Sequence, residues 1–159
     1  MALSVRGGGR MVVILALVIC SCGGDTTIDR LRNGTPAQRA EAAAFLGAQG
    51  VSEAIPALRE ALEDTVEDVQ AKVIWALGSL RAKASLSALI PLIASASRRI
   101  RQQAVQALAQ LEEPEVIPAL EAALNVEKDP WVRKDIQEAL QHLRQFQGET
   151  DLSQTTFRW

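Results

Sequence analysis

The chain has 159 residues, of which 48% are hydrophobic and only 4% are aromatic. This composition allows one domain with a core of leucine, isoleucine, valine and alanine, which favours packed helices over a β-sandwich or β-barrel. The formal net charge of −2 argues against binding nucleic acid through general electrostatic attraction. The only histidine is His142, and the two cysteines, Cys20 and Cys22, lie close to the N-terminus. We therefore expect no metal site, no cofactor and no cysteine–histidine nucleophile in the folded part.

Residues 1–22 have the features of a targeting segment. Arg6 and Arg10 precede an apolar run over residues 11–19, and no acidic residue occurs before Asp25. The apolar run is roughly half the ~20 residues that a membrane-spanning helix requires. We therefore predict an export signal and not a permanent membrane span.

The end of this segment, from Ile19 to Gly24, resembles a bacterial lipoprotein signal, in which cleavage precedes a cysteine that carries lipid. Cys22 fits that role better than Cys20, because small Ser21 precedes Cys22 whereas a bulky isoleucine precedes Cys20. The resemblance implies an exported protein anchored to the bacterial cell membrane through lipid on Cys22, with residues 23–34 as a tether and partial repeat. The alternative is an ordinary secretory signal in which the cysteines are incidental.

Apolar residues then recur with a period of 31 or 32 residues, as from Val69 to Ile100 and from Ile100 to Val132. In each copy they follow the spacing i, i+4, i+7, i+8 and i+11, which is the stripe of an amphipathic helix. The stripe residues of this first helix are Val69, Val73, Ala76, Leu77 and Leu80; Ile100, Ala104, Ala107, Leu108 and Leu111; and Val132, Ile136, Ala139, Leu140 and Leu143. A second helix repeats in step as Ile55, Leu58 and Leu62; Leu86, Leu89 and Ile93; and Ile117, Leu120 and Leu124.

The spacing predicts seven main helices, near residues 36–48, 53–63, 66–80, 85–95, 97–111, 114–125 and 130–146. Thr35 and Pro36 suit the start of the first of them, as N-cap and first-turn proline. Residues 35–146 would form the repeat domain. Residues 147–159 would form a flexible C-terminal tail.

Four short motifs within the copies carry a resemblance to a known family. They are Ile55-Pro56-Ala57-Leu58, Ile117-Pro118-Ala119-Leu120, Ala76-Leu77-Gly78 and Asp129-Pro130-Trp131-Val132-Arg133. They are similar to HEAT-type repeats of the short phycobilisome-lyase kind. The arginine that follows the first apolar residue in that family matches Arg39, Arg101 and Arg133, whereas the second copy has Gln70. The resemblance implies an all-α fold, a short right-handed α-solenoid of stacked antiparallel helix pairs.

Individual residues of the copies have predicted structural roles. Leu77 and Leu108 should be fully buried, each contributing about 1.5–3 kcal/mol relative to exposure. Gln38 replaces an apolar residue of the later copies, as is typical of a capping repeat with a solvated outer side. Gly78 should allow one helix to approach another closely, and Pro91 should bend the second helix in which it lies.

Four side chains are candidate contacts for a partner. Trp75 stands off the main stripe and could anchor a partner, although packing against a neighbouring first helix is the simpler interpretation. Arg98, Arg99 and Arg101 gather at one corner between helices. The matching corner of the preceding repeat is acidic, with Glu60, Glu63, Asp64, Glu67 and Asp68. This arrangement predicts ion pairs along the edge of the stack or, alternatively, a site for an acidic ligand.

We therefore predict a non-enzymatic protein-interaction or scaffold module, lipid-anchored in the bacterial cell envelope. Its partner would be another envelope or periplasmic protein, and no small-molecule substrate is evident. The family resemblance leaves an enzyme as the alternative, a bilin lyase or isomerase, against which export and the short chain argue. A passive structural component of the envelope is a third interpretation.

Overall fold

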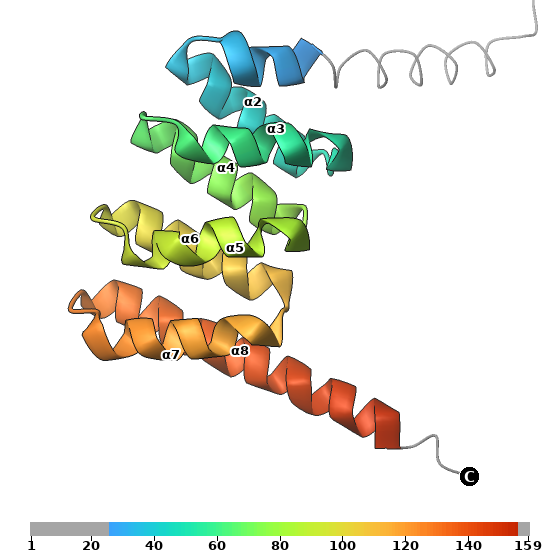
Figure 1. The fold of residues 1–159 in the computed structure, drawn as a ribbon, viewed down its shortest axis with the longest axis vertical. Helices are drawn as coiled ribbons and strands as arrows, with labels where there is room; N and C mark the ends of the chain where they lie inside the picture. The colour runs from blue at the N-terminus through green and yellow to red at the C-terminus, as the bar shows by residue number, and fades with distance from the viewer. Residues whose placement is uncertain (1–25, 156–159) are drawn as a thin grey trace, which may run out of the picture.

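The structure is a computed structural model that describes residues 26–155, and within that range it contains helices and turns but no strand. The predicted signal segment, with the proposed lipidation residue Cys22, lies outside the described residues. Figure 1 shows the helices stacked in chain order along the long axis of the molecule. The predicted all-α solenoid is therefore confirmed.

The helices form two series. The first helices of the copies are α2 (Pro36–Ala48), α4 (Glu67–Ser79), α6 (Arg98–Leu111) and α8 (Pro130–Thr155). The second helices are α3 (Ile55–Glu60), α5 (Leu86–Leu89) and α7 (Ile117–Val126). Short 3-10 turns flank the second helices, namely η1 (Ser52–Ala54), η2 (Ala61–Glu63), η3 (Lys83–Ser85), η4 (Ile90–Ala94) and η5 (Pro114–Val116). A further helix over residues 26–33 precedes α2.

The sequence period suggests that each first helix pairs with the second helix that follows it, but the structure pairs the helices differently. Each first helix packs against the next first helix, and each second helix packs most closely against the first helix that follows it in the chain. Between the two series, the closest neighbours are thus α3 with α4, η4 with α6, and α7 with α8. The helix over residues 26–33 fits this order, since its Leu31 is buried as the matching Leu62 of η2 is. It takes the place of a second helix at the N-terminal end of the stack.

The core is one continuous cluster of buried aliphatic side chains that extends from Leu31 to Leu143. Leu77 and Leu108 are fully buried, as predicted. Because every first helix buries side chains against its neighbours, the stack gains stability from contacts along the chain, as expected for a solenoid.

Two glycines set the distance between neighbouring first helices. A Cβ atom at Gly78 of α4 would lie 2.8 Å from the Cα atom of Ala107 in α6. The matching Gly47 of α2 has Ala76 of α4 equally close, with 2.7 Å between a Cβ atom and the Cα atom of Ala76. Separations this short do not occur between real Cβ atoms and their neighbours. The predicted role of Gly78 in close helix approach is therefore confirmed.

Pro91 lies where the second helix of the second copy changes type. There α5 ends at Leu89 and continues as the 3-10 turn η4, whereas α7 of the next copy, with Ala122 at the matching position, is α-helical throughout. The first copy makes the same change without a proline, since α3 continues as η2 with Glu60 at the matching position. The missing N–H of Pro91 therefore suits the 3-10 turn but does not by itself cause it.

The structure tests one prediction at each end of the repeat domain, the capping role of Gln38 and the end of the last helix. Gln38 is exposed, as a capping role requires, and it also closes a capping box with Thr35: the backbone N–H of Thr35 donates to Gln38 Oε1 at 2.9 Å. At the other end α8 continues to Thr155, so the predicted helix end near residue 146 is wrong. No proline, which would interrupt the helix, occurs between Phe146 and Thr155. The flexibility predicted for residues 147–159 stays a prediction, and residues 156–159 lie outside the described range.

Candidate functional site

Trp75, the predicted aromatic anchor, lies partly buried between α4 and α2. Its ring atom Cζ3 would be 3.1 Å from a Cβ atom built on Gly47, and the side chain packs against the core. The structure thus places Trp75 in a helix–helix contact, which was the simpler of the two interpretations.

The three predicted arginines of the corner each have an acidic partner. Arg99 pairs with Asp68 of the preceding copy at 2.7 Å, which confirms one ion pair along the edge. Arg98 and Arg101 turn the other way, toward the loop before α8, where Arg98 pairs with Asp129 at 3.3 Å. Arg101 pairs with Glu127 at 2.7 Å through side chains that are only 17% and 10% exposed. The other acidic residues of the corner do not pair with these arginines.

The position of Arg101 is the clearest repeated polar feature of the stack. Arg39, the matching residue of the first copy, donates from Nε and Nη2 to the two carboxylate oxygens of Asp64, at 2.7 and 3.0 Å. Each arginine also donates to a carbonyl of the loop before its helix, Gly34 for Arg39 and Ser95 for Arg101. These side chains therefore join consecutive inter-helix loops. Elsewhere Gln70 and Arg133 donate only to backbone carbonyls, those of Leu62 and of Leu124 and Glu127.

These contacts lower the pKa of both acidic partners. For Asp64, the hydrogen bond from Arg39 is the largest influence on its pKa, burial acts in the opposite sense, and the N–H of Val66 adds to the lowering. For Glu127, burial is the largest single influence and raises the pKa, but it is outweighed by hydrogen bonds from Asp129, Arg101 and Lys128. Both carboxylates are thus held in the charged form by donors in the loops.

An apolar groove of about 790 Å³ lies between η4 and α7. We call it the second-helix groove. Its apolar lining consists of Ile90, Ile93, Ala94, Ala119, Ala122, Ala123 and Val126. Val126 is 76% exposed. Arg101, Glu127 and Lys128 border it. The sequence contains a signal for this surface, because no charged residue occurs over residues 84–97, but neither the apolar stripe nor the motifs pointed to it.

A matching groove of about 420 Å³ lies two copies earlier, between the helix over residues 26–33 and α3. Adding 62 to Leu31, Ala57 and Ala61 of this groove gives Ile93, Ala119 and Ala123 of the second-helix groove. Its other lining residues are Arg32, Arg39, Glu60, Glu63, Asp64 and Thr65. Arg32 pairs with Glu60 and Arg39 with Asp64. The same place in the fold is therefore charged near the N-terminal end of the stack and apolar near the C-terminal end.

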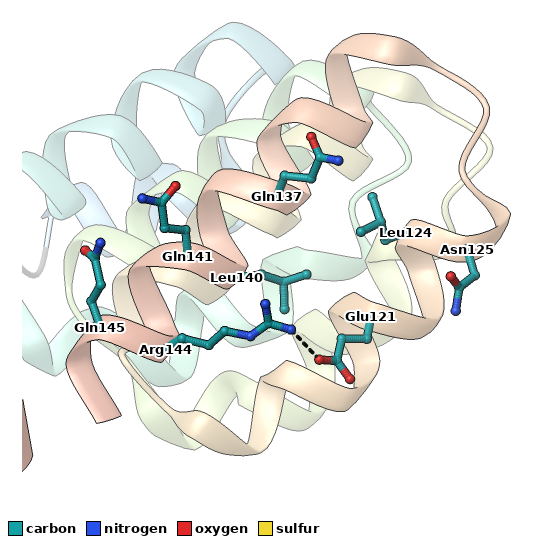
Figure 2. A pocket seen from close by; sticks show the side chains of 8 residues that line it. All are labelled: Glu121, Leu124, Asn125, Gln137, Leu140, Gln141, Arg144 and Gln145. Atoms are coloured by element: carbon teal, nitrogen blue, oxygen red, sulfur yellow. Dashed lines mark hydrogen bonds and ion pairs between the residues drawn. The ribbon is translucent and has the colours of Figure 1, made fainter. Parts of the chain in front are cut away.

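A third groove, of about 710 Å³, lies between α7 and α8 at the C-terminal end of the stack. We call it the end groove. Leu124 and Leu140 form its apolar part, and Arg144 Nη2 reaches Glu121 Oε1 at 2.7 Å across it. Figure 2 shows Leu140 and Arg144 on the side of α8 that faces α7. The remaining lining residues are the amides Asn125, Gln137, Gln141 and Gln145.

The three grooves present apolar side chains, amides and ion pairs. Among the described residues, no group of three or more histidine, cysteine, aspartate or glutamate side chains is placed to hold a metal ion. In the same part of the chain no helix combines the length and the apolar character that crossing a membrane would need. His142 is exposed on α8, with Nε2 3.9 Å from Glu112 Oε1, a carboxylate that also pairs with Arg81.

Comparisons with known proteins agree with this architecture. A family model for HEAT repeats matches residues 24–97 and 67–141. The crystal structure of an engineered protein is similar, with a TM-score of 0.62 and 19% identity over 76% of this chain and 62% of the other. The complex of CpcE and CpcF of phycocyanin lyase from Nostoc sp. PCC7120 is also similar, with a TM-score of 0.63 and 25% identity over 74% of this chain and 53% of the other.

The chain thus spans less than two thirds of the length of either similar structure. No curated protein matches it at a significant level. The two ranges matched by the family model together include every helix from α2 to α7 and the first half of α8. The chain therefore belongs to the family of HEAT-repeat proteins.

Proposed function

We propose that this chain is a non-enzymatic protein-interaction module whose contact surface is the second-helix groove. The observation that carries the proposal is the apolar lining of the groove, which ends at the exposed Val126. A single exposed apolar residue is common on protein surfaces, but apolar residues gathered in one open groove are typical of protein contacts. The polar border of Arg101, Glu127 and Lys128 matches the usual anatomy of an interface, an apolar centre with a polar rim.

We further propose that the module acts in the bacterial cell envelope, held at the membrane by lipid on Cys22. The support for this part is the sequence of residues 1–22 alone, with its arginines, its short apolar run and the small residue before Cys22. The partner would then be another envelope or periplasmic protein.

A bilin lyase or isomerase is the second candidate function, and the similarity to the CpcE–CpcF complex of phycocyanin lyase favours it. That reaction would require a bilin and a phycobiliprotein in the same compartment as the chain. Coexpression with a phycocyanin subunit and its bilin tests it directly. Covalent, fluorescent attachment of bilin to the subunit that depends on this chain would support the enzyme and contradict the proposal above.

The interaction module is tested by site-specific photo-crosslinking in a bacterial host. A photoreactive amino acid at Val126 should give a discrete adduct with one envelope protein. The same amino acid at Lys72, which is exposed on α4 outside the grooves, serves as the matched control and should give none. Ala122→Glu, which places a charge in the apolar lining, should abolish the adduct without changing the thermal unfolding temperature. Equal cross-linking from both positions, or an adduct insensitive to Ala122→Glu, would contradict the proposal. A passive structural component would give no adduct from Val126.

A further inference from the structure

The repeated arginine contacts are incomplete at the C-terminal end of the stack. Arg39 and Arg101 each join two loops: Nη1 donates to a carbonyl of the loop before their own helix, and Nε and Nη2 donate to a carboxylate in the following loop. These carboxylates belong to Asp64 and Glu127. Arg133 keeps the first half of this arrangement, since its Nη1 donates to two backbone carbonyls at the end of α7. Within the described part of the chain, its Nε and Nη2 contact no carboxylate.

Elsewhere in the stack, the acidic loop residue occurs only together with the arginine. In the second copy, Gln70 replaces the arginine and donates to a backbone carbonyl at 2.8 Å. The loop that follows this copy has Ser95 at the position that is acidic after Arg39 and Arg101. A guanidinium presents a planar charged fork that fits a carboxylate, whereas an amide has no charge to compensate. An arginine and not a glutamine at position 133 therefore indicates a carboxylate partner.

The terminal segments of the chain cannot supply this carboxylate. Because α8 runs as one helix to Thr155, its end lies about 33 Å along the axis from Arg133, and residues 156–159 span at most ~14 Å. The acidic residues near the end of α8 begin at Glu149, about 24 Å from Arg133 along the same axis. The one acidic residue before the described range is Asp25, which adjoins the helix at the opposite end of the stack. The partner of Arg133 must therefore come from another molecule.

A second copy stacked head to tail does not suit this role. At the N-terminal end of the chain, the position that matches the acidic loop residues is Asn33, which has no charge. Neighbouring first helices also need small residues where they meet, as Gly78 and Ala107 show. The matching positions at the two ends of the stack are Gln141 and Phe45, and Phe45 is 50% exposed. A copy in this position would bring two large side chains together and no carboxylate.

We propose that Arg133 binds a carboxylate on an acidic turn of a different protein, which packs on the C-terminal end of the stack. In the two complete contacts, the carboxylate also accepts from its own loop: Asp64 from the N–H of Val66 at 2.9 Å, and Glu127 from the N–H groups of the two residues that follow it. The expected occupant is therefore a turn that holds its own aspartate or glutamate in place, which lowers the cost of ordering it on binding. Leu124, whose carbonyl accepts from Arg133, lines the end groove next to this position. This goes beyond the proposed function, because the contact lies outside the second-helix groove and either surface can fail without the other.

The test uses the full chain, purified in mild detergent, and a phage-displayed library of cyclic twelve-residue peptides as the probe. The library is selected on the wild type and depleted on Arg133→Gln. Because the second copy has Gln70 at this position, glutamine can still reach the loop carbonyl, so the variant should unfold at the wild-type temperature, which circular dichroism verifies. The remaining peptides should share one aspartate or glutamate. Fluorescence anisotropy should show that Arg133→Gln weakens their binding at least about tenfold.

The matched control is Arg59→Gln. Arg59 is exposed on α3 and, among the described residues, also has no acidic partner. Its replacement removes the same charge at another place and should leave binding unchanged. Equal weakening by the two variants would show general attraction of acidic peptides to the chain and would overturn the proposal.

The peptide supplies the second half of the test. Replacing its shared acidic residue by the corresponding amide should weaken binding to the wild type about tenfold and hardly change binding to Arg133→Gln, because each group acts through the other. The proposal is overturned if no peptide survives the depletion, if the surviving peptides share no acidic residue, or if the two substitutions have additive effects.

Discussion

At the scale of single residues, Ser85 is the least expected feature of the core. It lies at the end of η3, fully buried, and among the described side chains its Oγ is the one buried polar atom without a hydrogen-bond partner. The matching residues of the neighbouring copies are Ala54 and Val116, both fully buried and apolar. A buried hydroxyl without a partner costs about 1–3 kcal/mol. This position therefore suits an apolar residue better than serine.

We predict that Ser85→Ala will raise the free energy of unfolding by about 1 kcal/mol, because it removes the unpaired hydroxyl and hardly changes the volume. Urea denaturation measures the effect through the transition midpoint. Ser87→Ala, at an exposed position two residues further on, should change the free energy of unfolding by less than about 0.5 kcal/mol. A lower midpoint for Ser85→Ala would indicate that the hydroxyl is hydrogen-bonded, for instance to water.

The Arg39–Asp64 pair predicts how stability depends on pH. The pKa of Asp64 is lowered from 3.8 in the folded chain, so the unfolded chain takes up a proton first as the pH falls. The pair therefore stabilises the fold above pH 4 or so, and this contribution is lost as the pH falls from about 4 through the lower pKa of the folded state.

Asp64→Asn should accordingly be less stable than the wild type at pH 7, and the difference should shrink below about pH 4. Unfolding curves recorded between pH 2 and 7 measure it. Glu60→Gln is the control, since its pair with Arg32 is half exposed and such pairs contribute little. A constant difference between wild type and Asp64→Asn over this whole range would refute the linkage.

At the scale of elements, the contact between first helices depends on small residues. Gly78→Ala has two opposing effects: alanine favours an α-helix by about 1 kcal/mol over glycine, but its Cβ atom would lie 2.8 Å from the backbone of Ala107. Backbone cannot move aside as the tip of a flexible side chain can. Overpacking of this kind costs about 1–3 kcal/mol.

We predict that the packing term exceeds the propensity term and that Gly78→Ala lowers the thermal unfolding temperature. The matching Gly47→Ala should behave alike, since Ala76 is equally close. Ser79→Ala, at an exposed position of the same helix, also gains helix propensity, though less than Gly78→Ala does, and has no clash, so it should be neutral or stabilising. If Gly78→Ala proves more stable than the wild type, α4 and α6 are further apart than the structure places them.

The elements also show what the sequence could predict. Stripes such as Val69, Val73 and Leu77 located the helices because one helical period recurs in every copy. The period could not reveal that α7 lies closer to α8 than to α6, since both neighbours bury the same stripe. Nor could it reveal the grooves, which are formed by residues about 30 positions apart, such as Ile93 and Ala123. Of the predicted site residues, Trp75 packs against the core and the three arginines form ion pairs with acidic residues of the same chain. In a stack of copies, a side chain at the edge of one copy lies beside the neighbouring copy, so it contacts that copy.

At the scale of the whole molecule, surface chemistry changes along the stack. The groove beside α3 is lined by charged side chains of both signs, such as Arg32, Glu60 and Glu63, whereas the second-helix groove is apolar. In Figure 1, α3 lies toward the N-terminal end of the stack and α7 toward the C-terminal end. If the chain is anchored through Cys22, the charged groove is nearer to the anchor along the stack than the apolar groove is. Residues 23–25, which precede the helix over residues 26–33, would span at most ~11 Å, which keeps the N-terminal end of the stack close to the membrane.

The net charge of the chain affects how it could be held at a membrane. Cleavage before Cys22 would remove Arg6 and Arg10 but no acidic residue, so the formal charge would change from −2 to −4. An anionic bilayer would then repel the net negative charge of the mature chain. Attachment by charge is therefore unfavourable, and lipid would have to hold the protein at the membrane. A single acyl chain gives only marginal attachment, whereas several chains on one cysteine make it stable.

We therefore predict that Cys22, and not Cys20, carries lipid. In a bacterial host grown with labelled fatty acid, Cys22→Ala should lose both the label and retention in the membrane fraction. Cys20→Ala is the matched control and should keep both, because cleavage before Cys22 removes residue 20. A high-salt wash should not release the wild type, since screening weakens charge-based attachment but not burial of acyl chains. Labelled Cys22→Ala protein, or wild type recovered in a freely soluble form, would show that the anchor is assigned wrongly.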